Sequence, residues 1–245
     1  MNTLFLPDMS ANPIIELINA GIFQGAHMVL TDVTVSVHEG EFVYIVGKVG
    51  SGKTSLIKTL NAELPLQKGQ GSVAGFDLQN LKAKDIALLR RKLGVVFQDF
   101  RLLTDRSVYK NLEFVLKATG WNQESGIKER IYNVLESVGM LEAEKKMPHE
   151  LSGGEQQRIV IARAVLNDPL IILADEPTGN LDPETSEEIL NLLIGLNKEG
   201  KTIVMASHDY ILIGKHRTRT LICENSEIKD TARFDGKVDF EALLE

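Results

Sequence analysis

One octapeptide has the residue types and spacing needed to bind a polyphosphate. Residues 47–54 read GKVGSGKT, which fits the pattern G-x-x-x-x-G-K-[ST]. The glycines allow successive backbone N–H groups to converge on phosphate oxygens, while the Lys53 ammonium is expected at the β- and γ-phosphates and the Thr54 hydroxyl at Mg²⁺. The predicted nucleotide contacts here are Gly47, Lys48, Val49, Gly50, Ser51, Gly52, Lys53, Thr54 and Ser55. The alternative, a plain glycine-rich turn before a helix, is disfavoured by the strand and helix patterns that flank the loop.

Two adjacent carboxylates end an apolar run much later in the chain. Asp175 and Glu176 follow residues 170–174 (LIILA), which read as a strand buried on both faces. Side chains of neighbouring residues at a strand end point in different directions, so the two carboxylates can have different chemical roles. We predict that Asp175 holds Mg²⁺ and that Glu176 orients or deprotonates an attacking water.

A third segment, residues 151–157 (LSGGEQQ), predicts a second anion site. Ser152 and Glu155 fit the S-x-x-E capping box of a following helix, which is the structural alternative. The two glycines between them weaken a first helical turn by about 1 kcal/mol each relative to alanine, which favours a backbone that a phosphate must approach.

Three strands and two helices are expected to position these residues. Glu41–Val46 reads as a strand that leads into the loop, and Thr54–Leu60 reads as the helix after it. Asp182 and Pro183 provide an N-cap and first position for a helix whose apolar face is Ile189, Leu190, Leu193 and Leu196. Residues 202–206 (TIVMA) then return as a strand after Gly200, so a βαβ unit and a parallel sheet are predicted.

The stretch from about residue 99 to residue 166 has no clear strand pattern. Its candidate helices are Val108–Ala118, Ile127–Val138 and Gln156–Leu166. We therefore expect a helical subdomain inserted into an α/β core.

Composition bounds the class of protein. The 245 residues are 43% hydrophobic and 25% charged, with 27 Lys and Arg against 34 Asp and Glu and a net charge of −7, which is typical of a globular chain and unfavourable for nonspecific binding to nucleic acid. The single cysteine, Cys223, favours a reducing compartment. Apolar runs are too short to span a membrane, and Met1–Pro13 reads as a loose tail rather than a signal peptide.

These motifs together resemble the ATP-binding cassette (ABC) ATPases. The chain carries, in the family's order, the phosphate loop, Gln98 in VVFQD, LSGGEQQ, the Asp175–Glu176 strand end, Asp182 in GNLD and His208 in ASHD. The resemblance covers residues 13–230 and implies an α/β, RecA-like P-loop NTPase core with a mostly parallel sheet and an N-terminal antiparallel part. It further implies ATP and Mg²⁺ as ligands and a domain over residues 14–230, with tails at residues 1–13 and 231–245.

The resemblance also implies roles for individual residues. Catalysis would involve Glu176, Lys53, the switch histidine His208 and Gln98, which would sense metal and water. Asp182 would lie at a dimer seam, and Phe23, in the turn after the first strand, would stack on adenine. The metal would contact Thr54, Gln98 and Asp175. In a head-to-tail homodimer, the second copy would contribute Ser152, Gly153, Gly154, Glu155 and Gln156 to each ATP site.

The cell-division cassettes are the branch of the family that the chain resembles most, through residues 97–114 and the extended LSGGEQQ and LADEPTGNLDPETS strings. This implies an integral membrane subunit as partner, at the cytoplasmic face of the inner membrane. Phe100, Leu102, Leu103 and Tyr109 are expected either to line a groove for that partner or to pack in the subdomain core. The alternatives are an ATPase subunit of a lipoprotein-release or macrolide-type exporter and a nucleotide-gated scaffold with little hydrolysis. A cassette acting on DNA or ribosomes is less favoured, because the sequence offers no basic stripe.

Overall fold

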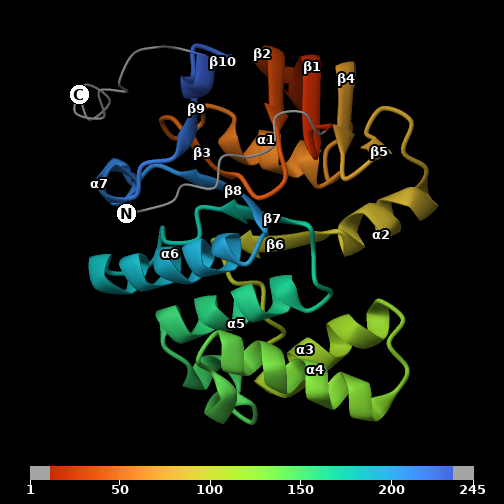
Figure 1. Cartoon of the computed structure of the whole chain (residues 1–245), viewed down its shortest axis with the longest axis vertical. Helices are drawn as coiled ribbons and strands as arrows, with labels where there is room; N and C mark the ends of the chain where they lie inside the picture. Colours follow the sequence, from red (N-terminus) through yellow and green to blue (C-terminus); the bar gives the residue numbers. More distant parts are fainter. Residues whose placement is uncertain (1–11, 234–245) are drawn as a thin grey trace.

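The computed structural model describes residues 12–233, and within them a six-stranded main sheet has the order β10-β9-β3-β8-β7-β6 (Figure 1). Its neighbouring strands are parallel except for β10, which pairs with β9 in the antiparallel sense. The strands are β3 (Phe42–Val46), β6 (Leu93–Phe97), β7 (Ile171–Asp175), β8 (Thr202–Ser207), β9 (Arg219–Glu224) and β10 (Glu227–Asp230). The three strands predicted from the sequence are confirmed to within one residue at each end.

A second, antiparallel sheet lies on one side of the main sheet, where Figure 1 draws it at the top. Among the described residues it has the order β2-β1-β4-β5. Its strands are β1 (Ile15–Gln24), β2 (His27–Val37), β4 (Lys68–Val73) and β5 (Phe76–Asp77). The expected α/β class, with a mostly parallel sheet and an N-terminal antiparallel part, is therefore confirmed.

The remaining secondary-structure elements are helices. They are α1 (Lys53–Leu60), α2 (Ala83–Arg91), α3 (Val108–Ala118), α4 (Glu124–Ser137), α5 (Gly153–Val165), α6 (Pro183–Lys198), α7 (Tyr210–Lys215) and the 3₁₀ turns Leu141–Ala143, Pro148–Glu150 and Thr231–Arg233. The described elements between β6 and β7 are all helical, as predicted. Both α4 and α5 begin three residues earlier than expected, because their polar first turns add nothing to the apolar periodicity on which the prediction depended.

The main sheet separates two hydrophobic cores. On β3, Phe42, Tyr44 and Val46 face the core shared with α3 to α7, whereas Val43 and Ile45 face the core shared with α1 and the antiparallel sheet. This alternation is the two-residue period of a strand that is buried on both faces.

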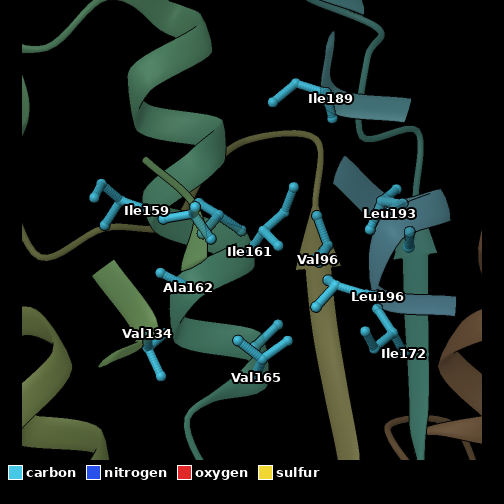
Figure 2. Packing of buried hydrophobic residues seen from close by; sticks show 14 of the residues in the cluster. Val96, Val134, Ile159, Ile161, Ala162, Val165, Ile172, Ile189, Leu193 and Leu196 are labelled. Atoms are coloured by element: carbon cyan, nitrogen blue, oxygen red, sulfur yellow. The ribbon is translucent and has the colours of Figure 1, made fainter. Parts of the chain in front are cut away.

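Helices α5 and α6 cover the first of these faces. Figure 2 shows Ile161 of α5 and Leu196 of α6 beside Val96 of β6, while Ile159 lies on the other side of α5, toward Val134 of α4. Because α5 is buried on two sides, its position is fixed by the sheet and by the neighbouring helices together.

The predicted tails, residues 1–13 and 231–245, fall mostly outside the described residues, so their assignment stays a prediction. Within residues 12–233, every helix falls short of the length and apolar character that a membrane span needs.

Candidate nucleotide site

The glycine loop joins the end of β3 to the start of α1 and requires glycine for space as well as for conformation. A Cβ on Gly47 would lie 2.4 Å from the backbone oxygen of Cys223, and one on Gly52 would lie 2.9 Å from Leu30 Cγ. Gly52 also has φ of 101°, a left-handed conformation that side chains disfavour, and it is the N-cap of α1. Contacts with buried neighbours therefore fix the path of the loop, which ends at the N-terminus of α1. A glycine loop that leads into a helix N-terminus is an arrangement that binds anions.

Lys53 is the first residue of α1, and its side chain reaches back to the backbone of this loop. Its Nζ donates to the backbone oxygens of Gly47 at 2.8 Å and Lys48 at 3.3 Å, and lies 3.4 Å from Glu176 Oε1. Only 6% of the side chain is exposed. Neighbouring Lys48 and Val49 are exposed, Val49 by 90%, on the outer side of the loop. A buried ammonium surrounded by oxygen acceptors is placed for exchange onto phosphate oxygens.

Thr54 and Asp175 form a pair of hard oxygen donors. Thr54 Oγ1 donates to Asp175 Oδ1 at 3.1 Å, at the end of β7. Burial raises the pKa of Asp175 above its usual value, the Thr54 hydrogen bond opposes the rise, and the charge of Glu176 adds to it. A divalent cation would relieve this unfavourable buried charge, so the pair fits Mg²⁺.

The protein supplies this cation with few ligands of its own. Across residues 12–233 there is no group of three or more His, Cys, Asp or Glu that could hold a metal ion. Mg²⁺ bound through one or two protein oxygens ordinarily completes its shell with phosphate and water, so the arrangement suits a metal that arrives with a nucleotide.

Glu176 directly follows β7 and is held by contacts to Ala206, His208 and Lys53. Its Oε2 lies 2.6 Å from His208 Nδ1 and accepts from the His208 backbone N–H at 3.3 Å, while Oε1 faces Lys53. Glu176 has φ of 51°, and its backbone N–H donates to Ala206 O, so the strand end turns the carboxylate toward β8. A carboxylate oriented in this way can accept a proton from water.

Gln98 lies one residue beyond β6, next to the carboxylates. Phe97 pairs with Asp175 in the parallel ladder, which places Gln98 beside the residues that follow β7. Its side chain contacts Gly179 and Asn180 there. Asn180 was not predicted from the sequence, because only the aspartate of the GNLD string matches a family motif.

The second predicted anion site lies at the start of α5. Ser152 Oγ accepts from the Glu155 N–H at 3.2 Å, and Glu155 Oε2 accepts from the Ser152 N–H at 2.7 Å, so the capping box is confirmed. A Cβ on Gly154 would lie 2.5 Å from Thr185 Cγ2, and one on Gly153 would lie 3.2 Å from Leu181. These glycines therefore have a packing role within the chain, which the phosphate interpretation alone did not include.

Asp182 is the N-cap of α6. Its Oδ1 accepts from the Thr185 N–H at 3.0 Å and its Oδ2 from the Thr185 hydroxyl at 2.6 Å, and these bonds hold the pKa of Asp182 below its usual value. Because Thr185 also contacts Gly154, the starts of α5 and α6 form one packed unit.

Phe23 lies in β1 rather than in the turn after it, which corrects the predicted position. It pairs with Met28 of β2 and is half-buried, and the turn consists of Gly25 and Ala26. The extended β1 was not evident because Asn19 and the bulged register with β2 interrupt its alternation.

The residues after Gln98 divide between core and surface. Phe100, Leu102 and Tyr109 pack against the helical core, whereas Leu103 is exposed. Packing is therefore confirmed for these three residues, which are only partly buried, and a groove for a partner stays a prediction.

Comparison with known proteins shows the family to which the chain belongs. Residues 30–179 match the family model described as ABC transporter. The chain is 49% identical to the cell division ATP-binding protein FtsE of Streptococcus pneumoniae serotype 2, over 81% of this chain and 86% of the relative. It is 40% identical to FtsE of Escherichia coli K12, over 84% of this chain and 92% of the relative.

Solved structures give the same result. A dimeric post-hydrolysis state of the ATP-binding cassette MJ0796, bound to ADP and Pi, aligns with a TM-score of 0.78 at 31% identity, over 88% of this chain and 96% of that one. The cbiO1 subunit of the Clostridium perfringens cbiONQ complex aligns with a TM-score of 0.81 at 27% identity, over 89% of this chain and 88% of that one. The chain therefore belongs to the ABC transporter family of ATP-binding proteins. Within that family it is similar to the cell division protein FtsE.

Proposed function

We propose that this chain is the ATP-hydrolysing subunit of a membrane complex and that it works as a head-to-tail homodimer. The observation that carries the proposal is the separation of two incomplete phosphate sites. Helix α1 packs in the core on one face of the main sheet, and α5 packs in the core on the other face. Twofold symmetry between two copies would join the Lys53 loop of one with the Ser152 turn of the other. The structural neighbour MJ0796 is described as dimeric, which supports a dimer of this chain.

The proposed chemistry uses groups that already lie together. A water oxygen bonds to the γ-phosphorus, the bond from that phosphorus to the β–γ bridging oxygen breaks, and ADP leaves. Glu176 accepts the proton of the water, and His208 holds the carboxylate through its ring and backbone nitrogens. Lys53 stabilises the charge on the phosphate oxygens. Thr54, Asp175 and Gln98 would hold Mg²⁺, which would supply further charge neutralisation for the phosphates, and Gln98 would also contact the attacking water.

A surface formed by α3 and the residues just before it is the proposed docking site for a membrane subunit. A hollow of about 280 Å³ is lined by Asp105, Arg106, Lys110, Glu113, Phe114 and Lys117. Phe114 is 52% exposed beneath the Arg106 guanidinium, 5.3 Å from its ring centre. An exposed aromatic side chain with paired charges around it fits an amphipathic segment of a partner. The buried Asn111 side chain bonds residues 103, 106 and 107 and so fixes the rim of the hollow.

The curated relatives favour cell division over the exporter alternatives. We propose an FtsX-like integral membrane partner at the cytoplasmic face of the membrane, to which closure of the ATP-bound dimer transmits force that controls cell-wall hydrolases. The arrangement of Glu176, His208 and Lys53 favours hydrolysis over a scaffold that only binds nucleotide.

A Glu176→Gln variant tests the composite site. The amide cannot accept the proton of water, whereas the phosphate contacts remain, so the variant should form a stable dimer with saturating ATP and Mg²⁺ and release almost no phosphate. Light scattering after size-exclusion chromatography would measure its mass. A variant that stays monomeric with ATP bound would contradict the proposal.

A Phe114→Asp variant tests the partner surface. Burying a carboxylate in the docked complex is unfavourable, so an integral protein that co-purifies with the wild-type chain from membranes should be lost. ATP binding should be unchanged, because Phe114 belongs to α3, whereas the nucleotide loop lies between β3 and α1. As a control, Ile18→Asp places the same charge on an exposed apolar position of β1. Equal recovery of the partner with both variants would count against this surface.

A further inference from the structure

Asn180 and Gln98 bond each other reciprocally. Asn180 Nδ2 donates to the backbone oxygen of Gln98 at 3.2 Å, and Gln98 Nε2 donates to Asn180 Oδ1 at 3.4 Å. A Cβ on the preceding Gly179 would lie 2.9 Å from Gln98 Nε2, so the backbone of the β7–α6 segment lies directly against the amide. Two segments that are far apart in sequence thus meet at this one side chain.

This pair of bonds selects one of the two orientations of the Gln98 amide. A side-chain amide has a donor end and an acceptor end of nearly equal size, so only its partners distinguish them. The backbone oxygen of Gln98 can only accept a hydrogen bond, so the NH₂ group of Asn180, rather than its Oδ1, must face it. Asn180 Oδ1 also can only accept, so it engages the Gln98 NH₂ group and leaves Oε1 as the free end of the amide.

The orientation matters for a metal ion and for water. A divalent cation binds an amide through oxygen, and its positive charge repels the NH₂ group. A water that gives one proton to Glu176 can donate its other hydrogen to the amide oxygen of Gln98 but not to the NH₂ group.

We propose that Asn180 is a positioning residue that fixes the amide of Gln98 with Oε1, rather than Nε2, available to the metal and water. This inference rests on the proposed function, in which Gln98 contacts the metal and the attacking water. It adds a physical link between Gln98 and the residues that lead to Asp182, so a movement of the β7–α6 segment would change the orientation of the Gln98 amide.

The experiment introduces Asn180→Ala into two backgrounds, wild type and Gln98→Glu. Both oxygens of a glutamate accept, so its orientation needs no partner. In the wild-type background, Asn180→Ala should raise the Mg²⁺ concentration that half-saturates ATPase activity by about two- to tenfold, the range expected for one lost neutral hydrogen bond. In the Gln98→Glu background, the same substitution should leave that concentration unchanged. Asn133→Ala, an exposed asparagine on α4, is the matched control. An equal change in both backgrounds would overturn the proposal.

A second measurement needs neither metal nor nucleotide. The side-chain amide resonances of Gln98, assigned by their loss in Gln98→Ala, should shift and exchange faster with solvent in Asn180→Ala than in the wild-type chain. Unchanged resonances would overturn the inference even if the chain hydrolyses ATP. If the wild-type chain lacks ATPase activity while the resonances do change, the proposed function fails and the positioning contact stands.

Discussion

The Asp175 carboxylate is a local source of instability. Burial raises its pKa, and Glu176 next to it adds a like charge. The folded chain therefore binds a proton at the Asp175 carboxylate more tightly than the unfolded chain does. Stability from this group is present in acid and is lost as pH rises through the folded pKa.

An Asp175→Asn variant should separate stability from function. It removes the buried charge and keeps an oxygen for the Thr54 hydroxyl, so the melting temperature without nucleotide and metal should rise by roughly 2–4 °C, the shift that about 1 kcal/mol gives a chain of this size. Mg²⁺-dependent ATPase activity should fall to background. Scanning calorimetry at neutral and acid pH measures the first effect, and the gain should shrink toward acid. A lower melting temperature at neutral pH would contradict the electrostatic argument.

Residues with a recognisable spacing could be predicted individually, and those without one could not. Thr54 and Asp175 were paired as metal ligands from their motifs, and the structure places them 3.1 Å apart. Asn180 has no spacing that marks it, because its role depends on a partner 82 residues away.

At the scale of elements, the contact between α5 and α6 gives the signature glycines a second role. Gly154→Ala should gain about 1 kcal/mol of helix propensity but place a methyl group 2.5 Å from Thr185 Cγ2, and overpacking of this kind typically costs about 1–3 kcal/mol. We expect a net loss in the free energy of unfolding, measured by urea titration.

Thr185→Ser provides the matched rescue. It removes Cγ2 and keeps the hydroxyl that donates to Asp182, so the double variant Gly154→Ala with Thr185→Ser should recover most of the lost stability. If Gly154→Ala keeps full stability and loses only ATP-dependent dimerisation, the glycine serves the phosphate rather than the packing.

Elements were predicted well where the apolar pattern of the sequence, either a continuous run or a helical stripe, matches the burial in the structure. Strands β3, β7 and β8 are short runs buried on both sides, and α6 has a clear cap and one apolar stripe. The extended β1 was misjudged at Phe23, because its bulges break the alternation that marks a strand.

At the scale of the whole molecule, the composite site predicts complementation. A mixture of Lys53→Ala and Ser152→Ala chains forms heterodimers in which one site carries both defects and the other carries none. If dimers form at random and each site acts independently, mixing should restore roughly a quarter of wild-type phosphate release, whereas each variant alone should release almost none. Activity that is not restored on mixing, when native mass spectrometry finds heterodimers, would contradict sharing of the site.

The sequence by itself determined the local chemistry and the elements that carry it. The glycine loop, the carboxylates at the end of β7 and the capping box at Ser152 are each marked by residues close together in the chain, so their spacing alone predicts where they lie in the chain and which chemistry they offer. Only the tertiary structure decided that Glu176 bonds His208 and Lys53, that Thr185 packs on Gly154 and that Asn180 holds Gln98. These contacts join segments that come together only when the two faces of the main sheet are packed, and no local period records which residues will meet there.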